Sequence, residues 1–203
     1  MEMAILDATQ NLLQTTALSD VSVARIIEQA EVSRTSFYFY FSSKEDVVVA
    51  LVKETSREVA GLIQPLLNRG DTPPEDAVRE SLTHWMTVAG EHAPVLAAAA
   101  EEWPRSPEIG EVWLRVMRRV SDALARAIDA ERSAGVAPAG VDSKTLATSL
   151  VWATERTFHV SAIGMQWLPD VESAIEPLVQ MYMGAIYGRP LEKIAKPRSR
   201  RRR

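Results

Sequence analysis

The sequence predicts an all-α protein of about nine helices, in which three short N-terminal helices precede a larger helical bundle. Apolar residues recur at the spacing of amphipathic helices along most of the 203 residues, and capping residues, glycines and prolines separate the segments. No segment alternates apolar and polar residues as a strand does. We therefore expect a first domain over residues 1–46, a bundle over 47–190 and a basic tail over 191–203.

Two short helices joined by a tight turn are predicted after a first helix over residues 2–15. Residues 22–30 carry apolar side chains at the spacing of a helix with one buried stripe, and Ser22 is a suitable N-cap. Ser33 is a suitable N-cap for the next helix, so only Glu31 and Val32 separate the two. This arrangement is typical of a helix-turn-helix motif, whose second helix enters the major groove of DNA.

Five aromatic residues in a row occupy positions 37–41 of the second of these helices. Successive side chains on a helix point about 100° apart, so five in a row cannot all enter one core. Phe37 and Phe41, four residues apart, are expected on the inner face. Arg34, Thr35 and Tyr38 then share another face, and their polar groups can meet base edges and phosphate oxygens in a DNA groove.

Because of these motifs, the first 50 or so residues resemble the DNA-binding domain of TetR-family transcriptional regulators. The resemblance implies base reading by Arg34 and Thr35, mixed base and phosphate contacts by Ser36, Tyr38 and Tyr40, and a phosphate contact by Lys44 at the start of the fourth helix. Ser22 and Arg25 complete the expected DNA-binding set. The family usually has glycine where this chain has Glu31, which predicts a positive φ for Glu31 at some energetic cost.

The charge distribution supplies no general attraction to DNA. The net charge is −4, and six positive charges lie in the last eight residues, so residues 1–195 carry a net charge of −10. The first 47 residues hold three basic and seven acidic side chains. The prediction of DNA binding therefore depends on the motif alone. We expect the protein to form few ion pairs with DNA phosphates, so that its affinity for DNA depends only weakly on salt concentration. The basic tail could add non-specific attraction, but a disordered solubilising tail is favoured.

A fourth helix is predicted to connect the two domains. Either Ser42 with Glu45 or Ser43 with Asp46 can cap its start, and its apolar stripe continues as one rod over residues 47–66.

Further helices follow a linker over residues 68–72. Thr72 and Glu75 form a capping box, with Pro73 at the first position of a helix that ends near Gly90. A short helix over residues 95–101 comes next. Three longer helices complete the bundle, over Ser106 to Gly135, 142–163 and 170–187, and Gly188 and Pro190 end the last of them.

Large aromatic and thioether side chains recur along the bundle, where they either fill the core or enclose an apolar pocket. Residues 128–132, 154–158 and 185–188 are similar to the branch of the TetR family that contains the mycobacterial regulator of ethionamide sensitivity. The family resemblance implies a pocket for an apolar small-molecule effector, with Thr154 as a polar anchor. The expected lining residues are Trp85, Met86, Trp103, Trp113, Met117, Trp152, Thr154, Phe158 and Tyr182.

The last two helices are also expected to form a homodimer. Ala153, Thr157 and Ser161 repeat at four-residue spacing, so small residues lie along one face where another helix could approach closely. The last helix adds Val171, Ile175, Leu178 and Tyr182. In the family these helices build a two-fold interface, which suits a palindromic operator; the alternative is packing within one subunit.

Several other classes of protein lack support in the sequence. The sequence contains no Cys, so disulfides and thiolate metal sites are impossible, and the three His show no metal-ligand spacing. It also contains no nucleotide-binding motif and no motif of a catalytic nucleophile. We therefore expect no metal, no cofactor and no catalysis. Glu155 and Arg156 could indicate a buried acid, but an ion pair tying helices together is favoured. No apolar run approaches the about 20 residues of a membrane span, and no signal peptide is evident, which favours a cytoplasmic protein.

The sequence is thus best interpreted as a one-component repressor. A dimer would bind double-stranded DNA at a palindromic operator, and an apolar effector in the bundle would change the separation of the two recognition helices. The alternatives are a helical sensor or scaffold that binds protein partners, which would suit the acidic balance, and a cofactor-less enzyme.

Overall fold

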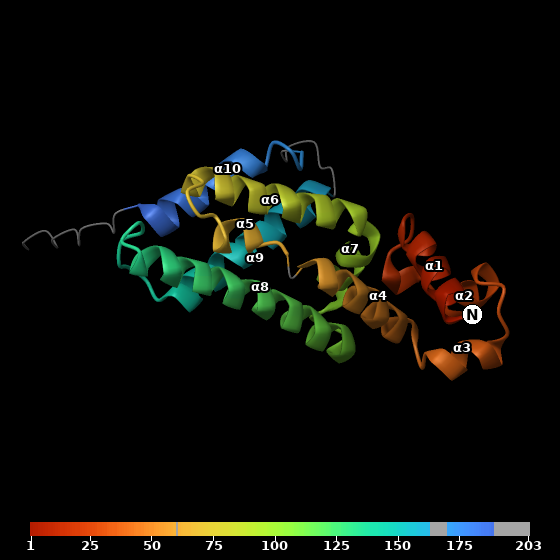
Figure 1. Cartoon of the computed structure of the whole chain (residues 1–203). Coiled ribbons are helices and arrows are strands. Elements are labelled where there is room, and N and C mark those ends of the chain that lie inside the picture. The colour runs from red at the N-terminus through yellow and green to blue at the C-terminus, as the bar shows by residue number, and fades with distance from the viewer. Residues whose placement is uncertain (60, 163–169, 189–203) are drawn as a thin grey trace, which may run out of the picture.

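The computed structural model describes residues 1–59, 61–162 and 170–188, and over these residues it is entirely helical, as predicted. It contains ten α-helices where about nine were expected, together with two short turns of other helix types (Figure 1). The elements are α1 (Glu2–Leu13), a 3₁₀ turn (Leu18–Asp20), α2 (Val23–Gln29), α3 (Arg34–Tyr40), α4 (Lys44–Val59), α5 (Gln64–Leu67), α6 (Pro74–Glu91), α7 (Ala93–Glu102), α8 (Pro107–Ser133), α9 (Ser143–Ala162), α10 (Ile175–Tyr182) and a π turn (Met183–Tyr187). None of these helices is long and apolar enough to span a membrane.

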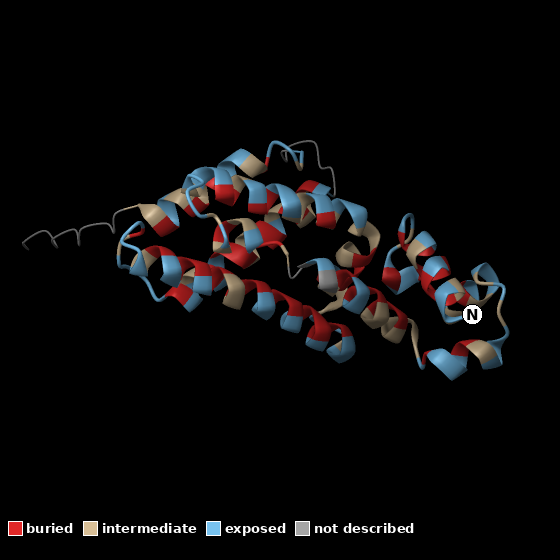
Figure 2. Ribbon diagram, in the orientation of Figure 1, coloured by how far each residue is buried: buried red, intermediate tan, exposed pale blue. Residues whose placement is uncertain are grey.

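The helices form an elongated molecule with a small unit at one end. Figure 1 shows α1, α2 and α3 grouped at that end, with α4 leading from them into a bundle of α5 to α10. In the bundle, α8 packs against α9 and α4, while α6 packs against α10 and α5. Buried residues line the inward faces of these helices, and exposed residues cover the outside (Figure 2). The small unit meets the bundle through contacts of α1 with α4 and α7.

Helix α8 is the longest element and begins and ends as its sequence predicts. The Ser106 hydroxyl accepts a hydrogen bond from the Ile109 amide at 3.3 Å, and Pro107 occupies the first turn, where its missing N–H costs nothing. Gly135 follows the helix with a φ of +74°, a conformation that glycine adopts without strain. One stripe along α8, from Ile109 to Ile128, is buried.

The predicted continuous rod between the two regions is wrong, because α4 ends at Val59 and a turn separates it from the short α5. Pro65 explains the break: proline has no N–H for the helix, and its ring would clash with the carbonyl of Gly61 four residues earlier. Leu62 and Leu66 are nevertheless buried, as the apolar pattern predicted. The error was to place them on the same continuous helix as Val47.

The predicted capping box of Thr72 is also absent. Helix α6 starts at Pro74, and Pro73 at the N-cap makes no side-chain hydrogen bond. Because the residue before a proline avoids the helical conformation, Pro73 stays extended with a ψ of 139°. The start of the helix therefore shifts by one residue and leaves Thr72 outside, where its carbonyl accepts a hydrogen bond from Arg69.

A buried ion pair fixes the linker before α6. The Arg69 guanidinium donates from Nε to Glu131 Oε1 at 2.7 Å and from Nη2 to Oε2 at 3.0 Å, a bidentate pair that joins the linker to the last turn of α8. Glu131 is 7% exposed, so the pair is shielded from water.

The last helix is shorter than predicted, whereas α9 follows its predicted range as far as the described residues extend. Asp142 caps α9 by accepting from the Thr145 amide at 2.9 Å, but Ile163 lies outside the described residues. Residues 171–174 form a turn rather than the start of α10. Beyond Tyr182 the helix widens into the π turn, and Gly188 follows, where a Cβ atom would collide with the Gly184 carbonyl. The predicted Pro190 stop and the basic tail also lie outside the described residues.

The turn between α2 and α3 has the predicted geometry. The Ser22 hydroxyl accepts from the Arg25 amide at 3.2 Å, and the Ser33 hydroxyl accepts from the Ser36 amide at 3.0 Å, so both N-caps are confirmed. Glu31 has a φ of +51°, as expected for a position where glycine is the unstrained choice.

The start of α4 follows the second of the two predicted caps. Ser43 accepts a hydrogen bond from the Asp46 amide at 3.1 Å, and the Asp46 carboxylate accepts one from the Ser42 amide at 3.1 Å. This reciprocal arrangement fixes the direction in which α4 leaves the N-terminal unit.

Replacing Glu31 by glycine is expected to stabilise the protein by roughly 0.5–1 kcal/mol, because it relieves the left-handed strain while adding some entropy to the unfolded chain. The matched control is Glu28→Gly, an exposed position inside α2, which should lose about 1 kcal/mol. Urea unfolding of both variants measures the difference. Equal destabilisation by the two glycines would show that Glu31 is not strained.

Candidate functional site

The aromatic run on α3 divides into inner and outer rings. Phe37 is fully buried and Phe41 is 7% exposed, with their ring centroids 6.2 Å apart, as predicted for the inner pair. They belong to the same core as Ile5 and Ile26, so they attach α3 to α1 and α2. Hydrophobic burial of this inner pair leaves the opposite side of α3 free to face a partner.

The outer side of α3 presents an exposed surface, which we call the α3 surface and define as Arg34, Thr35, Tyr38, Phe39 and Tyr40. The Arg34 guanidinium lies 5.7 Å from the Tyr38 ring centroid, within cation–π range. Ser36 is half-buried beside this surface, and its hydroxyl lies 2.9 Å from that of Ser33.

Phe39 is a member of this surface that the sequence interpretation missed. Its side chain is 79% exposed, the highest value among the exposed large apolar residues, and its ring meets Tyr40 edge-on with centroids 5.0 Å apart. The signal was available, because Phe39 lies two residues and thus about 200° from the buried Phe37. An apolar ring held in water suits contact with a thymine methyl group or a deoxyribose.

Lys44 is placed differently from what the resemblance implied. Its ammonium group donates to the carbonyls of Leu18 at 2.6 Å, Val21 at 2.9 Å and Ser19 at 3.3 Å. The three N–H donors of a lysine are thus all directed at the segment between α1 and α2. Lys44 fastens the start of α4 to that segment, and its charge does not point freely toward a phosphate.

Ser22 and Arg25 lie at the start of α2, and both side chains are exposed. The Ser22 hydroxyl is occupied as an N-cap, while Arg25 makes no ion pair among the described residues. Arg25 and Arg34 are therefore the cations of this unit that remain available to phosphates or bases.

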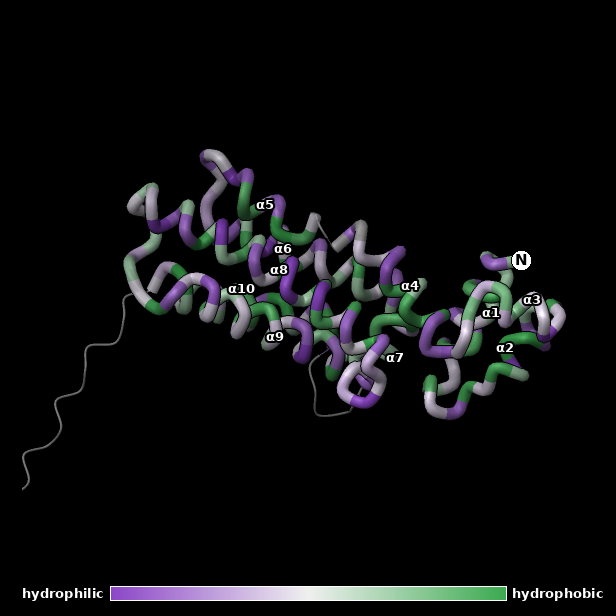
Figure 3. The backbone as a smooth tube through the Cα atoms, turned by 90° about the horizontal axis from the view of Figure 1, so that it is seen from below, coloured by the Kyte–Doolittle hydropathy of each residue, from purple (hydrophilic) through white to green (hydrophobic). Residues whose placement is uncertain are grey.

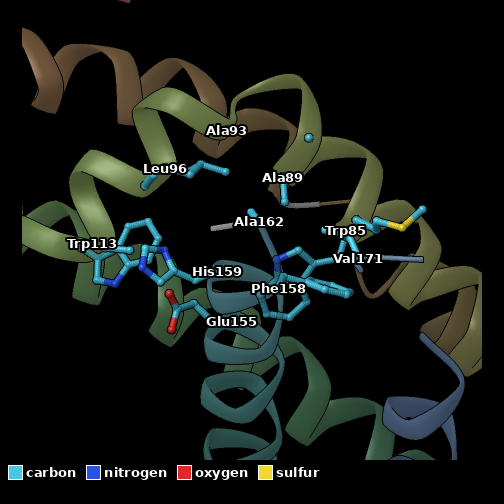
Figure 4. Close-up of a pocket in the computed structure, with 14 residues that line it drawn as sticks. Trp85, Ala89, Ala93, Leu96, Trp113, Glu155, Phe158, His159, Ala162 and Val171 are labelled. Carbon is cyan, nitrogen blue, oxygen red and sulfur yellow. The ribbon is translucent and has the colours of Figure 1, made fainter. Parts of the chain in front are cut away.

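The bundle encloses an apolar cavity of about 110 Å³ between α6, α7, α8 and α9 (Figure 4). Trp85 and Phe158 form part of its wall, with ring centroids 6.4 Å apart in a T-shaped arrangement. Smaller cavities of about 40 and 10 Å³ also border on Trp85. The residues lining the main cavity are Trp85, Met86, Ala89, Gly90, Ala93, Leu96, Ala97, Ala100, Trp113, Glu155, Phe158, His159, Ala162 and Val171.

The predicted pocket residues divide into three groups. Four of them line the main cavity: Trp85, Met86, Trp113 and Phe158. Met117 lines the 40 Å³ cavity and Tyr182 the 10 Å³ cavity, so both lie behind the main one.

Trp103, Trp152 and Thr154 lie outside the walls of these three cavities. Trp103 and Trp152 instead pack against each other, with ring centroids 5.7 Å apart. Thr154 is fully buried, and its hydroxyl bonds to the Leu150 carbonyl at 2.9 Å and the Tyr182 hydroxyl at 3.0 Å. Its expected role as a polar anchor is wrong, because its hydrogen bonds are satisfied within the protein.

Glu155 is the polar residue that lines the cavity instead, and the sequence interpretation gave it another role. Its Oε2 lies 3.7 Å from Arg156, its neighbour on the same helix, so the expected ion pair ties no helices together. Glu155 is 6% exposed, and burial raises the pKa of its carboxyl group. Burial also lowers the pKa of the neighbouring His159, which favours its neutral form.

The outer faces of α9 and α10 differ in part from the predicted dimer surface. Ala153 and Thr157 are half-buried on the outside of α9, but Ser161 is 5% exposed and belongs to the interior. Leu178 and Tyr182 are also buried within the subunit, where Tyr182 joins α10 to α9 through Thr154. Their expected place at a dimer interface is therefore wrong. Val171 and Ile175 are half-buried.

Comparison with known families identifies two parts of this chain. The family described as "Bacterial regulatory proteins, tetR family" matches residues 5–51. The family "Transcriptional regulator EthR, C-terminal domain" matches residues 78–188. The two matches cover the helix-turn-helix unit and most of the bundle.

Similar proteins extend over nearly the whole chain. The HTH-type transcriptional regulator EthR of Mycobacterium tuberculosis is 35% identical over 190 residues, which is 92% of this chain and 87% of that protein. The EthR of Mycolicibacterium smegmatis is 32% identical over 187 residues, 92% of this chain and 86% of that protein.

Solved structures share the fold at lower identity. A TetR-family regulator from Syntrophomonas wolfei aligns with a TM-score of 0.72 at 18% identity, covering 90% of this chain and 93% of that one. SmeT, the repressor of a Stenotrophomonas maltophilia multidrug efflux pump, aligns with a TM-score of 0.71 at 19% identity, covering 91% and 89%. These findings confirm the interpretation as a transcriptional regulator over the enzyme and scaffold alternatives. The chain belongs to the TetR family of transcriptional regulators, and its C-terminal domain is of the EthR type.

Proposed function

We propose that this regulator is a repressor that binds a palindromic operator as a dimer and is controlled by an apolar effector in the main cavity. The observation that carries the proposal is the α3 surface: three exposed aromatic rings and an arginine on a helix that Phe37 and Phe41 hold firmly from behind. An exposed surface that gathers several aromatic rings is typical of a site that binds another molecule. Such a regulator acts in the cytoplasm, where its operator is.

Within this surface the side chains divide by chemistry. Arg34 has the fork that reads guanine in the major groove, and Thr35 and Phe39 carry apolar groups suited to a thymine methyl. Ser36, Tyr38 and Tyr40 supply hydroxyl groups for bases and phosphates. Arg25, one helix away, is placed to contact a phosphate beside the groove.

Selection of bound fragments from random DNA is expected to return a palindrome, since a two-fold dimer presents two copies of α3. Arg34→Ala should then cost about 1–3 kcal/mol of operator binding and relax the preference at one base position. Arg25→Ala should weaken binding evenly across sequences and reduce the salt slope by about one. If the two variants have the same effect, base reading by Arg34 is wrong. Failure to select any sequence would refute operator binding itself.

For Lys44, we propose a structural role in place of the phosphate contact. Lys44→Met is expected to destabilise the protein by about 1–3 kcal/mol, because it leaves the partly buried carbonyl of Val21 without a donor and that of Leu18 with the Val21 amide alone. Lys53→Met, at an exposed position of α4, is the control and should have little effect. Chemical unfolding measures stability, and operator binding at several salt concentrations measures charge contacts. Unchanged stability with a smaller salt slope would restore Lys44 to the DNA interface.

We place the dimer interface on the outer faces of α9 and α10, which are neighbours in the view of Figure 3 and are joined by the hydrogen bond between Thr154 and Tyr182. Leu146, Ala153 and Val160 recur every seven residues along α9, and all three are half-buried. This is the spacing of a helix seam that packs against a second helix. Thr157 lies beside the seam, and in the π turn after α10 the exposed Ala185 offers a further small side chain.

Thr157→Arg is expected to convert the dimer to a monomer, because a two-fold interface would bring two like charges together at a cost of several kcal/mol. Thr148→Arg, on another exposed side of α9, is the control and should remain dimeric. Sedimentation velocity distinguishes the two states. A dimeric Thr157→Arg protein would place the interface elsewhere.

The main cavity is proposed as the effector site because its position allows it to act on α4. It is bounded by α7 and α8, and both of these helices contact α4. A ligand with different affinity for two arrangements of these helices would shift α4, and with it α3. The Bacillus subtilis regulator FadR, which shares the fold with a TM-score of 0.72 at 13% identity over 94% of this chain and 100% of that one, was solved in complex with stearoyl-CoA.

A further inference from the structure

Two buried polar atoms at the wall of the main cavity have no hydrogen-bond partner among the described residues. They are Oε2 of Glu155, on α9, and Nε1 of Trp113, on α8. Glu155 is 6% exposed and Trp113 is 4% exposed, and both line the main cavity and the adjoining one of about 40 Å³. Figure 4 shows the two side chains on the same side of the cavity, across from Trp85 and Val171.

No neighbouring group in the described part of the chain donates a hydrogen bond to the Glu155 oxygen. Arg156 lies 3.7 Å away, beyond hydrogen-bond distance, and its side chain is half exposed to solvent. His159, the other titratable residue of the wall, makes no hydrogen bond to it. The remaining wall is almost entirely apolar, being built of alanine, leucine, valine and aromatic side chains.

Four further buried polar atoms lack a partner among the described residues, but none of them lines the main cavity or the adjoining one: Ser81 Oγ, Arg132 Nε, Ser161 Oγ and Tyr187 Oη. Other buried polar groups of the bundle are satisfied within the protein. Glu131 accepts two hydrogen bonds from Arg69, and Thr154 is bonded to Tyr182. A buried donor or acceptor left without a partner costs about 1–3 kcal/mol, so one acceptor and one donor facing the same cavity are suited to a group that arrives from outside.

We propose that the effector is an apolar molecule with one neutral polar group that donates a hydrogen bond to Glu155 and accepts one from Trp113. This inference rests on the proposed function of the cavity and names the chemistry of its ligand. A primary amide combines both functions in one group, whereas an ether oxygen can only accept. An ionised carboxylate head group has no hydrogen to donate to Glu155, and an ammonium group has no acceptor for the Trp113 N–H.

Burial of Glu155 supports a neutral ligand. Desolvation raises the pKa of this carboxyl group, which favours its neutral form, and with that form a neutral ligand adds no net charge to the cavity. A hydrogen bond from a ligand amide satisfies Oε2 in either protonation state of the other oxygen.

The test uses four probes of matched chain length: octanamide, 1-methoxyheptane, octylammonium and octanoate. Their affinities for the full-length protein are measured by calorimetry. We expect octanamide to bind about tenfold or more tightly than each of the others, since only its head group satisfies both atoms while remaining neutral.

Variants at the two polar positions locate the effect. Glu155→Leu should reduce octanamide affinity about tenfold and leave 1-methoxyheptane unchanged, whereas Glu155→Gln keeps an acceptor oxygen and should retain octanamide binding within about threefold. Trp113→Phe removes the N–H and should also cost octanamide about tenfold. Trp103→Phe, outside the cavity walls, is the matched control.

Thermal melting verifies that the variants are folded. Glu155→Leu should melt no lower than the wild type, because it removes an unpaired buried carboxyl group.

A fifth variant separates this inference from the proposed effector site. Ala89→Phe fills the cavity and should abolish binding of every probe. If all four probes bind equally and Ala89→Phe abolishes binding, the cavity is the ligand site but the choice of head group is wrong. Tighter binding of octylammonium that Glu155→Gln removes would replace the neutral ligand by a cation. Binding that Ala89→Phe leaves intact, or no binding of any probe, overturns the effector site together with the inference.

Discussion

The packing of α4 joins the two ends of this molecule. Its first turn is held by Lys44 to the segment between α1 and α2, and Val47 and Val48 are fully buried. Farther along, α4 packs against α8 and α7. His92, between α6 and α7, adds a hydrogen bond of 3.2 Å to Glu58 near the end of α4. Since α7 and α8 also bound the main cavity, α4 connects the walls of the cavity with the helix-turn-helix unit, and α1 contacts α7 directly.

The DNA-binding end relies on shape and specific groups more than on charge. Its first 47 residues contain seven acidic and three basic side chains, and one of the basic ones, Lys44, is directed inward. In the proposed DNA complex, Arg25 and Arg34 would therefore supply most of the electrostatic attraction to phosphate. The exposed rings of Tyr38, Phe39 and Tyr40 would supply the remaining affinity by contact in the groove.

Two carboxyl groups are buried among the described residues of the bundle, and their surroundings differ. Glu131 is fully paired with Arg69, and this pair fixes the linker that leads into α6. Glu155 has a similarly low exposure but no hydrogen-bond donor for Oε2. The paired carboxylate is a structural feature, while the unpaired one, facing a cavity beside Trp113, has the properties of a recognition group.

Features that depend on neighbouring residues could be predicted from the sequence. The caps at Ser22 and Ser33, the strained Glu31, the division of the aromatic run and the start of α8 all follow from local geometry. The break at Pro65 is also local, and the sequence interpretation overlooked it. The partners of Lys44, Thr154 and Glu155, in contrast, depend on the packing of the helices. Lys44 meets a carbonyl 26 positions away, Thr154 meets a hydroxyl 28 positions away, and Glu155 meets a cavity walled by four helices. Burial and hydrogen bonding between distant residues depend on how whole helices pack, which periodicity along one helix does not specify.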